Sequence, residues 1–244
     1  MMKNRKAAFT LAEVLITLGI IGVVAAMTLP TLIQNHQKQV WATSAKKSYA
    51  VISNMLQKMM ADEGASSITN TTLFTDGLCT TSNNCEDSYG NPGILKNLIP
   101  KYLKVTKTCE DSECNIKYRR AVLKGNNVLE VEPDLYSVSF LMFSDGTKPY
   151  GFYTNDGKIY YFDLWGRYGE SASASIKVCF DINGEKGPNT RGRDVFCTEY
   201  CKNGRLSAVT NDYTSCTYSE EELKDLTSQY PLYHLMSNGW KMDY

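Results

Sequence analysis

The strongly apolar residues of this chain are concentrated in one run near its N-terminus. The run extends from Ala7 to Ile33, and its last twenty residues, 14–33, contain no formally charged side chain. An α-helix rises about 1.5 Å per residue, so this segment is long enough to cross a hydrocarbon layer of about 30 Å. Because no comparable run follows, the pattern predicts one membrane span rather than a polytopic protein.

From Gln34 onward the sequence becomes polar but keeps a helical repeat. Apolar or small residues recur every three or four positions, at Trp41, Ala45, Ser48 or Tyr49, Ile52, Met55 or Leu56, and Met59. Such a stripe is typical of a helix that packs one face on a globular core. We therefore expect one helix from Thr10 to about Glu63, ended by Gly64 and kinked or loosened at Pro30, which lacks an amide donor.

Beyond Gly64 the pattern changes to that of a small antiparallel sheet. Segments rich in aromatic and β-branched residues lie at 136–143, 150–153, 158–164 and 175–180. The sequences at 144–146 and 155–157 are typical turns between such strands. A helical stretch at 94–103 is interrupted by Pro100, and a capping sequence at Ser219 begins a late helix that extends to about Gln229. The predicted fold class is therefore α+β.

Charge sets the expected orientation of the span. Lys3, Arg5 and Lys6 precede the apolar run, and the first twelve positions contain no acidic residue. Basic residues favour the cytoplasmic side of a membrane, so the rest of the chain should lie outside the cytoplasm. Over the whole chain 26 basic residues balance 26 acidic ones, which argues against nucleic acid as a partner. The basic patch at 117–120 keeps DNA uptake open as an alternative.

One acidic side chain, Glu13, interrupts the apolar run. An ionised side chain at the centre of a membrane helix costs about 2.5 to 3.5 kcal/mol on insertion scales, so this carboxylate needs a partner. If the chain is cut after Ala8, the new α-amino group of Phe9 lies four residues before Glu13. The two charges can pair along one helix or between neighbouring subunits of a bundle. In the second case Glu13 is an assembly residue.

Residues 7–16, with the sequence AAFTLAEVLI, resemble the class III signal of type IV pilins and type II secretion pseudopilins. The resemblance implies that prepilin peptidase cuts between Ala8 and Phe9 and methylates the new N-terminus. It also implies that Glu13 docks the subunit into a helical filament. Pro30 matches a proline that recurs in the long helix of this family, whereas Ala8 departs from the usual glycine before the cut. The resemblance covers about the first thirty residues.

The organisation implied by this resemblance is a leader at 1–8, a membrane-spanning half-helix at 9–33, an amphipathic half-helix at 34–63 and a pilin-like head at 64–244. In that head the long helix packs on a small antiparallel sheet with disulfide-stapled loops. The implied function is that of a structural subunit of a type IV pilus or a type II secretion pseudopilus, and we expect no enzyme.

The expected partners are prepilin peptidase, other pilin-like subunits, and an inner-membrane assembly platform with its ATPase. The subunit is expected to span the cytoplasmic membrane once, with its head outside the cytoplasm, before it joins a periplasmic or extracellular filament.

An ordinary secretory signal is the alternative interpretation of the N-terminal segment. Residues 1–6 would be its basic region, residues 11–24 its apolar core and residues 24–26 its cleavage site. Cleavage there would release a soluble, disulfide-rich binding or adhesin module. Glu13 is unfavourable inside such an apolar core, however, and the apolar character continues to Ile33. We therefore favour the membrane-anchored interpretation.

Eight cysteines lie at or beyond position 79, entirely on the C-terminal side of the apolar run. This distribution is typical of a disulfide set in an oxidising compartment. We expect local pairing among the first four, Cys79 with Cys85 and Cys109 with Cys114. Pairing among the other four remains open; they are Cys179, Cys197, Cys201 and Cys216. Zinc ligation by Cys197 and Cys201 is a weaker alternative, because no C-x-x-C pair is present.

Oxygen-bearing side chains surround glycine turns between residues 181 and 194. Asp181, Asn183, Glu185 and Asp194 are candidate ligands for Ca²⁺, which takes six to eight oxygen atoms. Major pseudopilins, which the chain resembles, carry an Asp- and Gly-rich calcium loop near the C-terminal end of the head. The alternative is an Asx turn, in which Asp and Asn side chains bond to their own backbone.

Overall fold

The computed structural model describes residues 10–76, 92–110, 113–114, 116–124, 127–137, 149–165, 175–201, 206–207 and 230–244. The expected turn at 144–146, the expected helix at 219–229 and most of the expected strand at 136–143 lie outside these residues. The chain divides into two compact units, residues 1–40 and residues 41–244.

The described part of the first unit is the N-terminal stretch of helix α1 (Leu11–Glu63), which continues through Pro30. Its large apolar side chains are exposed: Leu11 is 79% exposed and Ile33 is 64% exposed. Within the described part of the chain, α1 is the one helix long and apolar enough to cross a membrane. A contiguous apolar surface of this kind indicates that lipid or other protein helices cover it.

Helix α1 ends where the sequence predicts. Gly64 follows its last residue with a φ of +64°, which glycine adopts without steric cost because it has no Cβ. The Gly64 amide donates to the Ala61 carbonyl at 3.3 Å, and the Ala65 amide donates to the Met60 carbonyl at 2.9 Å. These two bonds form a Schellman motif, which satisfies carbonyls that the helix itself leaves unpaired.

In the second unit, the C-terminal half of α1 packs into a hydrophobic core through a single face. Its buried residues recur every three or four positions; they are Ala42, Ala45, Ser48, Ile52, Met55, Leu56 and Met59. Trp41 and Tyr49 are half-buried beside this core. The helical stripe expected from the sequence is therefore confirmed, with the small residue Ala42 rather than Trp41 at the buried position nearest the start.

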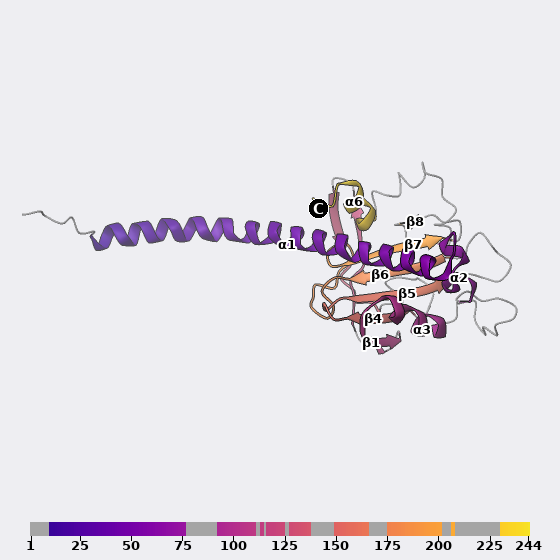
Figure 1. Cartoon of the computed structure of the whole chain (residues 1–244). Helices are drawn as coiled ribbons and strands as arrows, with labels where there is room; N and C mark the ends of the chain where they lie inside the picture. The colour runs from indigo at the N-terminus through magenta and orange to yellow at the C-terminus, as the bar shows by residue number, and fades with distance from the viewer. Residues whose placement is uncertain are drawn as a thin grey trace, which may run out of the picture. The chain divides into compact units, whose positions relative to one another are not determined.

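A six-stranded antiparallel sheet forms the centre of the second unit, with the spatial order β1-β4-β5-β6-β7-β8 (Figure 1). Its strands are β1 (Val105–Glu110), β4 (Tyr150–Thr154), β5 (Ile159–Trp165), β6 (Ser175–Asp181), β7 (Val195–Cys201) and β8 (Leu206–Ser207). A separate hairpin is formed by β2 (Ala121–Lys124) and β3 (Val128–Val131). The strands expected at 150–153, 158–164 and 175–180 are confirmed as β4, β5 and β6.

Short helices complete the described part of the second unit: η1 (Ile68–Asn70), α2 (Thr72–Thr75), α3 (Pro92–Tyr102) and α6 (Pro231–Ser237). The interruption expected at Pro100 was wrong, because α3 continues through this residue to Tyr102. Burial of Leu98 and Ile99 in the core holds the last turn in place. Tertiary packing thus outweighs the amide hydrogen bond that the proline removes.

The two faces of the sheet bury different kinds of side chain, because successive residues of a strand point to opposite sides. On β5, Tyr160 and Phe162 belong to the core that also contains the buried residues of α1 and α3. Ile159 and Tyr161 belong to a second cluster on the opposite face, together with Tyr118 and four cysteines. The first face is therefore an aromatic core, and the second is held by covalent links.

Two disulfides lie on this second face. Cys179 on β6 and Cys197 on β7 are paired directly across the two strands, with a Cα–Cα distance of 4.0 Å. Cys109 and Cys114 close a short loop at the end of β1, which is the local pairing expected from their spacing. Gly151 on β4 leaves the space for that loop: an added Cβ would lie 2.6 Å from the Cys109 Sγ and 2.9 Å from a Tyr161 ring carbon.

We predict that Gly151→Ala destabilises the head by about 1 to 3 kcal/mol, the usual cost of overpacking a filled core. The free energy of unfolding is measured by denaturant titration of the full chain in detergent. Gly187→Ala is the control, since a Cβ there meets only the Asn189 amide nitrogen at 4.0 Å. Replacing both Cys109 and Cys114 with alanine should reduce the cost of Gly151→Ala. An equal cost in that background would show that the sulfur atoms are not the obstruction.

Candidate functional site

The start of α1 is organised by Thr10 and Glu13. The Thr10 amide and the Thr10 Oγ1 both donate to Glu13 Oε2, each at 2.8 Å, and the Glu13 amide donates to Thr10 Oγ1 at 3.2 Å. This reciprocal arrangement is a capping box, which satisfies amide donors that the first turn of a helix leaves unpaired. A carboxylate at this position is also favoured by the helix dipole.

Glu13 therefore also caps the start of α1. This role was not predicted from the energetic cost of placing a charged side chain in a membrane. Its partner Thr10 was missed in the sequence analysis, although the pattern Thr-x-x-Glu before an apolar run is a readable signal for a capping box. Both donors of Thr10 go to one oxygen of the carboxylate, Oε2. Within the described residues, no hydrogen bond or ion pair reaches Oε1, so this oxygen remains open to a partner.

The other residues of the proposed processing and assembly site are placed only in part. Ala8 and Phe9 lie outside the described residues. Pro30 lies inside α1 among exposed apolar side chains.

The candidate calcium residues form a buried turn structure between β6 and β7. Asp181 Oδ1 accepts the amides of Asn183 (3.1 Å) and Gly184 (2.8 Å), and both carboxylates, Asp181 and Asp194, are fully buried. Asp194 Oδ1 accepts the Thr190 amide at 2.7 Å, and its Oδ2 accepts the Asn189 amide at 2.8 Å. The two acids thus fix the backbone of the loop.

The second oxygen of Asp181 also has a partner. The Tyr118 hydroxyl donates a hydrogen bond to Asp181 Oδ2 at 3.2 Å. The same hydroxyl oxygen lies 2.7 Å from the hydroxyl oxygen of Tyr161. Burial, together with the nearby charge of Asp194, raises the pKa of the Asp181 carboxyl well above its usual value. Burial also raises the pKa of Asp194 and of Tyr118.

These contacts are those of Asx-type turns, in which the carboxylates accept amides of their own loop. Among the four calcium candidates, Asn183 Oδ1 is the buried side-chain oxygen for which the described residues supply no hydrogen-bond partner. Glu185 is exposed. Among the described residues, no three His, Cys, Asp or Glu side chains are grouped as metal ligands. The geometry favours the Asx-turn alternative.

The structure also bears on the cysteines. Cys197 is bonded to Cys179, so it offers no thiolate to zinc. Cys201 is placed only as the last residue of β7. Cys79, Cys85 and Cys216 lie outside the described part of the chain.

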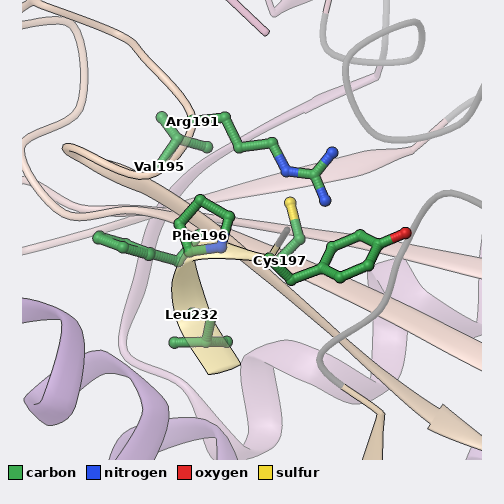
Figure 2. A pocket seen from close by; sticks show the side chains of 7 residues that line it. Arg191, Val195, Phe196, Cys197 and Leu232 are labelled. Carbon is green, nitrogen blue, oxygen red and sulfur yellow. The ribbon is translucent and has the colours of Figure 1, made fainter. Parts of the chain in front are cut away.

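A hollow over β7 is lined in part by Cys197 of the Cys179–Cys197 disulfide (Figure 2). It is lined by Arg191, Val195, Phe196, Cys197 and Leu232 among others, and it has no space for a water molecule. The Arg191 guanidinium lies over the Tyr230 ring, 5.6 Å from the ring centre. Burial lowers the pKa of Arg191 to about 10, so it remains charged at neutral pH. This hollow is packing between β7 and the C-terminal segment rather than a ligand site.

We predict that Asp194→Ala destabilises the head by about 2 to 4 kcal/mol, because it leaves two amide donors without their acceptor. Asp194→Asn, which keeps one acceptor oxygen, should lose less. Melting temperatures of the full chain in detergent, recorded with calcium chloride and with EDTA, measure both effects. The wild-type value should be the same in the two solutions. A melting temperature that rises with calcium in the wild type but not in Asp194→Ala would instead support a calcium loop.

Comparison with known proteins bears on the N-terminal segment. Residues 3–29 match the model of the prokaryotic N-terminal methylation motif, the prepilin-type cleavage and methylation signal of type IV pilin-like proteins. The resemblance found from residues 7–16 is thereby confirmed. No curated protein and no solved structure matches the chain. The motif implies processing by prepilin peptidase and assembly with other pilins. The chain therefore carries the N-terminal signal of type IV pilin-like proteins in front of an α+β, pilin-like architecture.

Proposed function

We propose that the chain is a structural subunit of a type IV pilus or a type II secretion pseudopilus. In this proposal prepilin peptidase cuts between Ala8 and Phe9 and methylates the new N-terminus, and the subunit then assembles through α1. The observation that carries the proposal is the methylation motif at 3–29 on a helix whose apolar side chains are exposed. The head would face the periplasm or the outside of the cell, as the basic residues at 3–6 favour.

The exposed apolar half of α1 explains why such a subunit can occupy two environments. Lipid covers these side chains before assembly, and neighbouring helices cover them in a filament. Moving from one to the other changes little apolar exposure, so the hydrophobic effect does not drive the step. Packing and polar contacts must supply the selectivity, and Glu13 is the acidic residue of the apolar segment.

Glu13 can combine capping and docking because its two oxygens are used differently. Oε2 holds the Thr10 donors of its own helix, while Oε1 is free to accept from the α-amino group of Phe9, on the same or a neighbouring subunit. Removing the leader creates that amino group, which is positively charged when protonated. Cleavage would thus supply the partner that an acid in lipid requires.

We predict that Glu13→Gln and Glu13→Ala both leave the protein inserted and processed but reduce filament yield by about tenfold or more, because each removes the charge. The two variants differ in capping: glutamine can still accept the Thr10 amide in a capping box, and alanine cannot. Filament yield is measured by shearing and immunoblotting, and processing by the size of the mature protein.

Thr10→Val is the matched control for this comparison. It removes the hydroxyl contacts but keeps the Glu13 charge, so filament yield should stay within about twofold of the wild type if pairing of the charge is what matters. Wild-type yield in Glu13→Gln, combined with loss in Glu13→Ala and Thr10→Val, would assign Glu13 to helix capping alone.

We also predict that mature protein extracted from membranes begins at Phe9 and carries one added methyl group on its α-amino nitrogen. N-terminal sequencing and intact mass spectrometry measure this directly. Replacing Ala8 with a bulky residue such as Leu should block the cut, because the peptidase of the family acts after a small residue. A mature protein that begins at Met27, without the apolar segment, would support the alternative of a secreted module released by ordinary signal peptidase.

A further inference from the structure

The head contains an open cleft that the proposed assembly role does not use. Its cavity volume is about 720 Å³, within the range of about 300 to 1,000 Å³ that is typical of ligand sites. The residues that line it are Lys107 on β1, Glu113, Ile116, Lys117 and Arg119, Leu135, Tyr153 on β4, and Glu185, Gly187, Pro188 and Asn189. Five separate parts of the chain therefore converge on one cleft.

Three cationic residues line this cleft: Lys107, Lys117 and Arg119. Lys107 Nζ lies 5.1 Å from the centre of the Tyr153 ring, a cation–π contact between two residues of the lining. The ion pairs formed among the described residues join other groups, at Lys124–Glu130, Lys158–Asp156 and His234–Asp243. The cations of the cleft are thus available to a ligand.

Two carboxylates, Glu113 and Glu185, line the same cleft, so three positive side chains face two negative ones. The remainder of the lining is apolar or backbone, including Ile116 and Leu135. A matching ligand carries several negative groups, hydrogen-bond donors for the two carboxylates, and an apolar or aliphatic body. An extended acidic peptide has all three, because its backbone amides are donors and its side chains alternate in character.

We propose that this cleft binds an acidic segment of a partner polypeptide. Lys107, Lys117 and Arg119 pair with its carboxylates, Glu113 and Glu185 accept its amide donors, and Tyr153 contacts its aliphatic stems. The proposal concerns the head alone and does not depend on how the N-terminus is processed.

A nucleic acid fits the same cleft less well. Its backbone carries a negative charge at every nucleotide, so some phosphates would lie against Glu113 or Glu185. A peptide places its charges only where its sequence has acidic residues. Within the basic run at 117–120, Lys117 and Arg119 line the cleft, whereas Arg120 lies over the Tyr136 ring.

Fluorescence anisotropy with the full chain in detergent micelles tests the proposal, using a fluorescein-labelled hexaglutamate peptide as the probe. We expect binding that weakens as salt is added, because the cations are exposed or half-buried. The double variant Lys107→Glu/Lys117→Glu should weaken binding by about tenfold or more. Glu113→Gln/Glu185→Gln should strengthen it, since each glutamine still accepts amide donors but no longer repels the continuous negative charge of hexaglutamate.

The matched control is Lys96→Glu/Lys101→Glu, which makes the same change in net charge at exposed positions of α3 outside the cleft. This variant should stay within about twofold of the wild type in its affinity for hexaglutamate. Circular dichroism and melting temperature check that all variants remain folded.

Four results would overturn the proposal. They are no binding of hexaglutamate, equal losses in the two lysine double variants, equally tight binding of a labelled hexalysine peptide, and equally tight binding of a labelled oligothymidylate with six phosphates. The last result would show a site for polyanions in general rather than for an acidic peptide.

Discussion

The structure depends on a change of character within one helix, which follows Ile33. Up to this residue most side chains of α1 are apolar and exposed, whereas from Trp41 onward α1 is apolar on one face only. The second half can therefore bury Ala45 and Ile52 against aromatic residues of the sheet such as Phe162. Without that stripe, one face of the sheet would expose its aromatic side chains, because antiparallel strands place alternate residues on each side.

The opposite face of the sheet is stabilised in another way. A disulfide joins neighbouring strands through Cys179 and Cys197, and a second one closes the loop that follows β1. Buried polar groups beside them, Tyr118 and Asp181, are hydrogen-bonded rather than left unpaired. The covalent links add stability by restricting the unfolded chain, and the hydrogen bonds offset the cost of burying polar groups.

Several parts of the fold could be predicted from the sequence because they depend on local chemistry. The helix end at Gly64 follows from the conformation that glycine tolerates, and β4 and β5 follow from their aromatic content around the Asn155–Gly157 turn. The Thr10–Glu13 capping box could also have been predicted from the local sequence. It was missed because Glu13 was considered only as a charge in lipid. The break expected at Pro100 was wrong because the surrounding core, which a local pattern does not contain, holds α3 together.

By itself, the sequence determined the membrane-compatible helix, the N-terminal processing motif and the α+β class, since each depends on patterns among residues that are close together in the chain. The tertiary structure alone decided that Cys179 pairs with Cys197, because that link depends on the register between β6 and β7. It also decided that Asp181 and Asp194 bind backbone amides, and that Lys107 and Arg119 line one cleft. These contacts join segments that are distant in the chain, so their distances are set by packing and strand pairing rather than by spacing in the sequence.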